Sequence, residues 1–137
     1  MKKNKKIKKV FVDLSATLIH HGHIRLLKKS SKFGKVIVGL STDKEIKKFK
    51  GFYPELNFKQ RKEIISSIKY VDQVIPSNWL ISNSFLIRNK INVIVRGHDH
   101  RKDKFSIKTI IFPRTKGISS KKIRVKASKI LKSKSYK

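Results

Sequence analysis

The sequence has no cysteine, which excludes disulfides, thiolate catalysis and any zinc site built on cysteine. Without disulfides, an intracellular, cytoplasmic protein is the default expectation. Acidic residues are also scarce, with 8 Asp and Glu against 36 Lys and Arg. No two of these acids form an obvious catalytic pair, which argues against a two-carboxylate hydrolase. No apolar run approaches the roughly 20 residues that a membrane span needs, and the run after the basic N-terminus is too short for a signal peptide.

The excess of basic residues gives the chain a formal net charge of +28. A field of that size attracts polyanions of several classes, including nucleic acids, acidic membranes and nucleoside triphosphates. Most of the basic residues are lysine, whereas proteins that read nucleic acids often use arginine for its bidentate geometry. A general lysine bias of the proteome explains the same composition. Charge alone therefore does not select a function, although the basic ends are expected to contact polyanions non-specifically.

The 137 residues suit a single domain, which we place at residues 9–131, between a basic extension at 1–8 and a basic tail at 132–137. Short apolar runs predict five buried strands, at residues 10–14, 36–40, 73–75, 91–95 and 109–112. Helices are predicted at residues 22–32, 57–70 and 80–89 and after Ser119. Residues 44–56 are expected to be irregular, because Gly51 and Pro54 break regular structure.

The strands are apolar throughout and alternate with helices, which predicts an α/β fold with a parallel sheet covered on both faces. Such sheets bind their ligands at the carboxyl ends of the strands. Most of the polar residues of interest follow predicted strands, so they are expected to meet at that edge.

All five histidines lie in two clusters: His20, His21 and His23 after the first predicted strand, and His98 and His100 after the fourth. Beside the first cluster, glycine at position 22 lets the backbone approach a ligand closely. The helix that begins here offers unpaired N–H groups and a positive dipole end to an anion. Phosphate binding, a metal site and a polar loop without a ligand all fit this spacing.

Two motifs near opposite ends of the chain resemble motifs of one enzyme family. His20-His21-Gly22-His23 is similar to the HxGH motif of the nucleotidyltransferase superfamily. Residues 114–120, Arg-Thr-Lys-Gly-Ile-Ser-Ser, resemble the RTEGIST-type motif of its cytidylyltransferase branch. The resemblance covers residues 8–124 and takes in enzymes that act on glycerol 3-phosphate, phosphocholine or phosphonates. It implies a Rossmann-like nucleotidyltransferase domain that transfers CMP from CTP to a small phosphorylated or phosphonate acceptor and releases pyrophosphate.

The resemblance also implies roles for single residues. His20 and His23 would hold the CTP phosphates, Lys50 would reach the α-phosphate, and Arg114 would grip the β- and γ-phosphates. Lys47 and Lys48 compete with Lys50 for its role. The other nucleotide contacts are expected from Ser15, Ala16, Gly22, Arg96, Gly97, Asp99, Thr115, Ile118, Ser119 and Ser120.

Arg61 and Trp79 are the candidates for the acceptor site, with a solvent-facing arginine and a core or rim aromatic as the alternatives. No metal site made by the protein is expected, because Mg²⁺ would bridge the triphosphate oxygens and keep most of its waters. Because the family is commonly dimeric, a homodimer is the default expectation.

Three features depart from the family pattern. Thr17 stands where relatives usually carry an aspartate, three residues before the first motif histidine, so a carboxylate that could orient a histidine or help with metal is missing. His98 and His100 replace acidic and aromatic residues, which suggests a different or pH-sensitive acceptor. Lys116 occupies a position where an acid is common.

Glycerol 3-phosphate is the leading acceptor, while the loop at Ser15-Ala16 is equally similar to that of the phosphonate enzymes. Two other functions stay open. One is a nucleotidyltransferase of the same superfamily that uses ATP, because the contacts that select the base are not visible in sequence. The other is a non-catalytic protein that binds nucleic acid through its basic ends. The nucleic-acid-binding alternative predicts that binding of RNA or DNA depends steeply on salt and that no pyrophosphate is released. The intact histidines and Arg114 argue against it.

Overall fold

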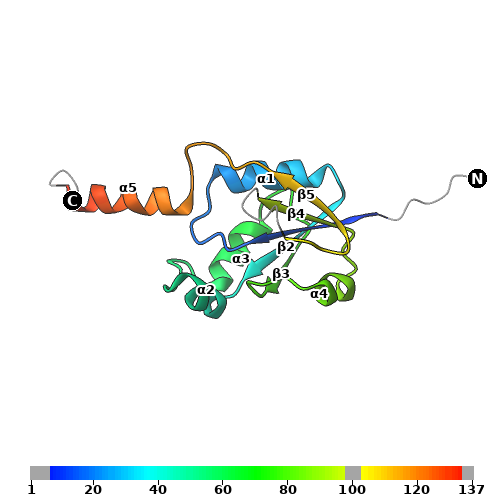
Figure 1. The fold of residues 1–137 in the computed structure, drawn as a ribbon. Helices are drawn as coiled ribbons and strands as arrows, with labels where there is room; N and C mark the ends of the chain where they lie inside the picture. Colours follow the sequence, from blue (N-terminus) through cyan, green and yellow to red (C-terminus); the bar gives the residue numbers. More distant parts are fainter. Residues whose placement is uncertain (1–6, 98–102, 134–137) are drawn as a thin grey trace, which may run out of the picture.

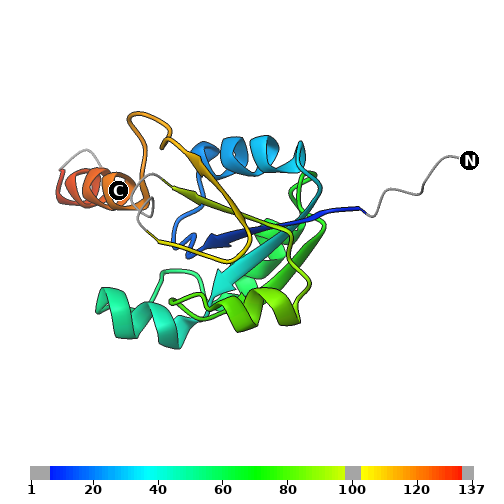
Figure 2. The same cartoon turned by 45° about the vertical axis from the view of Figure 1, so that its right-hand side comes forward.

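The computed structural model describes residues 7–97 and 103–133. Its framework is a five-stranded, all-parallel sheet in the order β3-β2-β1-β4-β5 (Figures 1 and 2). The strands are β1 (Lys9–Leu14), β2 (Lys35–Ser41), β3 (Gln73–Ser77), β4 (Val93–Gly97) and β5 (Lys108–Phe112). The helices are α1 (His21–Ser31), α2 (Asp43–Lys50), α3 (Phe58–Ser66), α4 (Asn83–Arg88) and α5 (Ser120–Lys132). The predicted α/β fold is confirmed.

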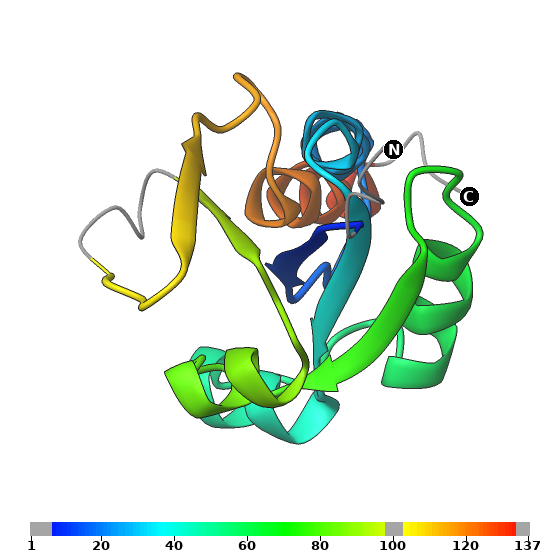
Figure 3. The ribbon, with the colours of Figure 1, turned by 90° about the vertical axis from the view of Figure 1, so that its right-hand side faces the viewer.

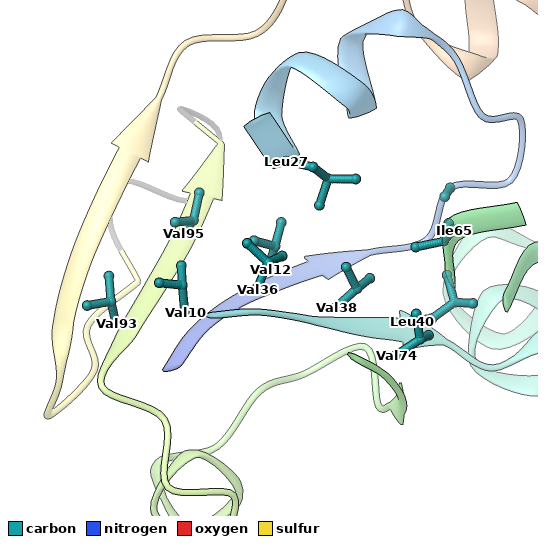
Figure 4. Packing of buried hydrophobic residues seen from close by; sticks show 11 residues of the cluster. Val10, Val12, Leu27, Val36, Val38, Leu40, Ile65, Val74, Val93 and Val95 are labelled. Atoms are coloured by element: carbon teal, nitrogen blue, oxygen red, sulfur yellow. The ribbon is translucent and has the colours of Figure 1, made fainter. Parts of the chain in front are cut away.

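Helices cover both faces of the sheet because β1 is apolar on both of its sides. Val10 lies on one face, in the apolar cluster that also contains Leu27 of α1 and Ile65 of α3; Figure 4 shows the side chains of this cluster. Phe11, the next residue along, packs on the opposite face with Leu86 of α4. Figure 3 shows α1 and α4 on opposite sides of the strands. The uninterrupted apolar runs therefore reflect a sheet that is buried on both faces.

The strand order creates a crevice at one edge of the sheet. The chain runs outward from β1 through β2 to β3, then returns to form β4 on the other side of β1. The connections leave β1 and β4 in opposite directions, so their carboxyl ends open a crevice at this switch point. The loop that follows β1 and the end of β4 at Gly97 therefore lie at the same place, which fixes the position of the site.

The prediction that residues 44–56 are irregular is wrong for their first part, which forms α2. Thr42 caps this helix, its hydroxyl accepting a hydrogen bond from the Glu45 N–H at 3.3 Å. Acidic residues occupy its first turn and lysines its last, which suits the helix dipole. Gly51, at φ +84°, ends the helix instead of interrupting a loop. Ile46 is its one buried residue, and Phe49 follows three positions later on the same side of the helix. The prediction failed because Gly51 and Pro54 outweighed this short helical spacing.

Other element boundaries shift by a few residues. The helix predicted to reach residue 70 ends at Ser66, the helix predicted over 80–89 is limited to α4, and the fourth strand begins and ends two residues later than predicted. The cap at Ser119 is confirmed, because its hydroxyl accepts from the Lys122 N–H at 3.0 Å.

The last helix, α5, extends away from the sheet (Figure 1). None of its residues is buried, and the apolar side chains of Val125, Ile130 and Leu131 are exposed. None of the helices in the described ranges combines the length and the hydropathy that crossing a bilayer would require.

Candidate active site

A pocket of about 430 Å³ opens at the carboxyl edge of the sheet, where the sequence predicts the site. Its walls come from the loop after β1, the start of α1, the end of α2, the end of β4, and the segment that joins β5 to α5. Thirteen of the predicted site residues line it: Ser15, Ala16, His20, Gly22, His23, Lys50, Trp79, Gly97, Arg114, Thr115, Ile118, Ser119 and Ser120.

His20 and His23 are held in place by the first turn of α1. The His20 Nδ1 accepts a hydrogen bond from the Gly22 N–H at 3.1 Å, and the His23 Nδ1 accepts from the His20 N–H at 3.1 Å. The two bonds form a reciprocal capping box, and the ring centroids lie 4.0 Å apart. Because each Nδ1 is an acceptor, the proton of each neutral ring must lie on Nε2. The helix start thus provides two Nε2–H donors.

Both imidazoles are neutral near pH 7. Burial, followed by the neighbouring His20 and Lys50, lowers the pKa of His23 to about 4. Burial also lowers the pKa of His20, followed by the effect of His21. The two rings therefore serve as hydrogen-bond donors at neutral pH without carrying a full charge.

Gly22 links the two sequence motifs through close packing. A Cβ at this position would lie 2.8 Å from His20 Cε1 and 3.3 Å from the Ile118 Cγ2 methyl. Both separations are shorter than ordinary carbon–carbon contacts. Glycine is therefore required here for the His20 ring to fold back on its own helix and for Ile118, almost a hundred residues later, to pack beside it.

Lys50, the last residue of α2, reaches the pocket from the side of β2. Its ammonium group donates to the Ser15 hydroxyl at 3.3 Å and lies 5.6 Å above the centre of the Trp79 ring. Trp79 in turn stacks on Phe49, with 5.5 Å between ring centroids. Burial lowers the pKa of Lys50, and the positive charges of Arg124 and Arg114 lower it further. Several cations thus converge on the pocket, which favours a polyanionic ligand.

Of the three competing lysines, the structure brings Lys50 into the pocket. Lys47 instead donates to the Gly51 carbonyl at 3.0 Å and lies above the Tyr53 ring. Lys48 lies above the Phe49 ring. The position at the end of the helix, one residue before Gly51, distinguishes Lys50 from its neighbours.

The start of α5 forms the wall opposite Lys50, and it is hydrogen-bonded to the loop that joins β1 to α1. The Ser120 hydroxyl donates to the Leu18 carbonyl at 3.0 Å and accepts from the Leu18 N–H at 3.4 Å. Arg114 lines the pocket on the same side, and the first turn of α5 contains no acid. Helix N-termini with unpaired N–H groups bind anions, so this wall and the histidines form a cradle suited to phosphates.

The structure does not support direct contact between Arg61 and an acceptor. Its side chain is 0% exposed and bonded on three sides, to the Leu56 carbonyl at 3.0 Å, the Ser15 carbonyl at 2.7 Å and the Asp43 carboxylate at 2.7 Å. Arg61 instead ties α3 to the loop after β1 and to the start of α2. It holds in place Ala16, whose φ of +44° is unusual for a residue other than glycine.

Arg96 is likewise buried below the pocket instead of lining it. It pairs with Asp103 at 3.0 Å and with Asp13 at 3.5 Å, and it is 5% exposed. Its neighbour Gly97 does line the pocket. The other predicted residue of this motif, Asp99, lies outside the described residues, as do His98 and His100.

Sequence reasoning missed several pocket residues, among them Asp13, Lys29 and Lys121. Lys121 directly follows the second motif, and that adjacency could have identified it. Lys29 lies seven residues, about two helical turns, after Gly22 on α1, so the helical period would have placed it on the same side as Gly22. Thr17, the departure from the family pattern, is 1% exposed, and its hydroxyl has no hydrogen-bond partner among the described residues.

Comparison with known proteins agrees with this geometry. A family model described as cytidylyltransferase-like matches residues 16–126. The chain is 38% identical to the glycerol-3-phosphate cytidylyltransferase of Staphylococcus aureus, over 86% of this chain and 93% of that protein. It is 36% identical to the enzyme of the same name from Bacillus subtilis, over 86% of this chain and 95% of that protein. A solved structure titled as a lipopolysaccharide core biosynthesis protein from Thermoplasma volcanium has the same fold, with a TM-score of 0.70, 23% identity, and coverage of 80% of this chain and 98% of that one.

The pocket with its paired histidines, the motif before α5, and the matches along most of the chain agree with one another. The chain belongs to the cytidylyltransferase-like family of nucleotidyltransferases.

Proposed function

We propose that the protein transfers CMP from CTP to glycerol 3-phosphate and releases pyrophosphate. The observation that carries the proposal is the pairing of two fixed imidazole donors at the start of α1 with Arg114 and the start of α5 in one pocket. A triphosphate carries negative charge along several linked groups, which suits hydrogen-bond donors and cations on both walls of one pocket. The choice of acceptor rests on the names of the relatives that are 36–38% identical over most of the chain.

The proposed reaction is an in-line displacement at the α-phosphorus of CTP. A phosphate oxygen of the acceptor forms the new P–O bond as the bond to pyrophosphate breaks, so no covalent enzyme intermediate is needed. The Nε2–H groups of His20 and His23 would donate to the phosphate oxygens, and Lys50 would neutralise charge that builds up on the α-phosphate. Arg114 and the start of α5 would bind the β- and γ-phosphates that depart together. Positioning and charge stabilisation thus account for catalysis.

Mg²⁺ fits this site as an ion bound mainly by the nucleotide. Among the described residues, no three His, Asp or Glu side chains are grouped to hold a metal, and Asp13 is the one carboxylate among the pocket residues. We propose that Mg²⁺ binds together with the triphosphate, and that the Asp13 carboxylate would accept hydrogen bonds from its water ligands. The ion would supply charge neutralisation on the phosphates.

The acceptor would enter beside Trp79 and Lys50, opposite the triphosphate cradle. Both residues line the pocket, and the indole ring and the ammonium group lie within 5.6 Å of each other. An aromatic face and a cation suit a small molecule that combines a carbon backbone with a phosphate. We further propose the homodimer expected from the family, which sedimentation analysis of the full chain would test.

The deciding experiment measures pyrophosphate release with CTP or ATP and a panel of acceptors: glycerol 3-phosphate, phosphocholine, phosphoethanolamine and 2-aminoethylphosphonate. We expect release with CTP and glycerol 3-phosphate, and loss of release in His20→Asn. Release with another acceptor would replace glycerol 3-phosphate, and release with ATP alone would assign the protein to an adenylyltransferase role. No release and no binding of either nucleotide would overturn the proposal.

A further inference from the structure

One ion pair joins α5 to the segment that follows Lys50. The Arg124 Nε and Nη2 atoms donate to the two Glu55 carboxylate oxygens, each at 2.6 Å. The same guanidinium lies 4.8 Å above the centre of the Phe52 ring. The hydrogen bond from Arg124 is also the main cause of a lowered pKa of Glu55. Such two-pronged geometry is the most favourable form of an arginine–carboxylate pair.

Both partners are close in sequence to pocket residues on opposite walls. Arg124 lies one helical turn after Ser120, which lines the pocket and bonds to Leu18. Phe52 and Glu55 lie on the short segment, residues 51–56, that begins directly after Lys50. The far end of that segment is fixed by the hydrogen bond from Arg61 to the Leu56 carbonyl. The Arg124–Glu55 pair therefore fixes the outer part of the segment to the helix that forms the triphosphate cradle.

We propose that Arg124 and Glu55 are positioning residues that join the two walls of the nucleotide site before CTP binds. This inference rests on the proposed function and deepens it. Ordering a free segment costs conformational entropy, and a site that is ordered in advance avoids that cost when its ligand binds. Without the pair, residues 51–56 and the end of α2 would become ordered only when CTP binds. The free energy of CTP binding would then be reduced by the cost of that ordering.

Three explanations of an Arg124 effect predict different results. If Arg124 only adds positive charge near the pocket, any lysine of α5 should matter as much, and removal of the Glu55 charge should strengthen CTP binding. If Arg124 contacts CTP directly, loss of Glu55 should have little effect on CTP binding. If the pair positions the site, the loss of either partner should weaken CTP binding, and the Glu55 effect has the opposite sign from that of the charge explanation.

The test compares the full-length variants Arg124→Gln and Glu55→Gln with Lys126→Gln, an exposed residue of the same helix that undergoes the same change of charge as Arg124→Gln. We expect both pair variants to raise the KM for CTP about three- to tenfold, in line with one bidentate pair plus a cation–π contact. The KM for the acceptor and the melting temperature should change little, and Lys126→Gln should stay within about twofold of wild type. The reversed pair, Glu55→Arg with Arg124→Glu, should recover part of the loss.

Hydrogen–deuterium exchange of residues 51–56 provides a measurement that needs no activity. Exchange should be faster in both pair variants than in wild type and in Lys126→Gln. If the wild type turns over no acceptor, equilibrium binding of CTP replaces the KM. A wild type that does not bind CTP would overturn the proposed function. A wild type that binds CTP while Glu55→Gln binds it equally well or more tightly, or while the reversed pair recovers nothing, would overturn the positioning role alone.

Discussion

At the scale of single residues, phosphate binding in the pocket depends on the His20 Nε2–H donor, because His20 Nδ1 is already bonded to the Gly22 N–H. His20→Asn keeps an acceptor for the Gly22 N–H, because the Asn side-chain oxygen occupies nearly the place of Nδ1, but it removes the Nε2–H donor. We expect kcat/KM to fall by about 10²–10³-fold, as when a transition-state donor is removed, with the melting temperature nearly unchanged. His20→Ala should also lose the cap and about 1 kcal/mol of stability. Activity retained in His20→Asn would show that Nε2 is not the working atom.

The depressed pKa of His23 predicts a pH dependence of stability. The unfolded chain binds a proton on this ring near pH 6.5, whereas the folded protein binds it only near pH 4. The stabilisation is therefore complete above about pH 6.5 and is lost as the pH falls towards 4, by at most about 3 kcal/mol. Denaturant unfolding of His23→Gln, which keeps the cap acceptor, should show a flatter dependence between about pH 5 and 7. Equal slopes for wild type and variant would contradict the assignment.

Sequence reasoning predicted the histidines and Arg114 from short local motifs, and the structure places them, together with Lys50, in one pocket. Lys50 had no local motif to distinguish it from Lys47 and Lys48. Sequence reasoning failed for Arg61, whose role depends on acceptors from three separate segments of the chain. No local pattern distinguishes a fully buried arginine from a solvent-facing one on a helix. The position of Ile118 against Gly22 was equally inaccessible, because it depends on packing between the two ends of the chain.

At the scale of elements, Arg61 joins α3, α2 and the loop after β1. Arg61→Gln would leave the Leu56 and Ser15 carbonyl groups without this donor, and each buried group left unpaired costs about 1–3 kcal/mol. It would also break the ion pair with Asp43, whose carboxylate is 34% exposed and keeps the hydrogen bond from the Phe58 N–H. We expect a large loss of stability in denaturant unfolding, and a loss of activity that follows the unfolded fraction. A variant of normal stability with a raised KM for the acceptor would instead restore the direct role predicted from the sequence.

Among the elements, the strands were predictable because short apolar runs mark them, and the runs of β1, β2 and β4 are largely buried. The edge strand β5 is also apolar but has no buried residue, so the prediction of a buried strand is wrong there. The short α2 was not predicted, because Gly51 and Pro54 were weighed more heavily than the cap at Thr42 and the spacing of Ile46 and Phe49. The ion pair between α5 and residues 51–56 was also beyond reach, since 69 positions separate its partners.

At the scale of the whole molecule, the net charge of +28 should draw CTP towards the pocket. We expect the KM for CTP to rise severalfold between about 0.05 and 0.5 M salt, while kcat changes little, because screening weakens the long-range attraction. The matched measurement uses potassium glutamate in place of chloride, to separate screening from competition by the anion. A KM that does not respond to ionic strength would show that the contacts inside the pocket dominate.

The pocket takes its walls from both ends of the chain, residues 13–23 and residues 112–121, and this has a consequence for synthesis. A ribosome makes residues 13–23 well before residues 112–121, so we expect that a triphosphate cannot be held in the pocket until the later segment has emerged and packed. A message cut short after β5 would yield four of the five helices and the complete sheet, yet no functional cradle. If the proposed function is correct, we expect such an incomplete copy to bind CTP weakly and to transfer no CMP.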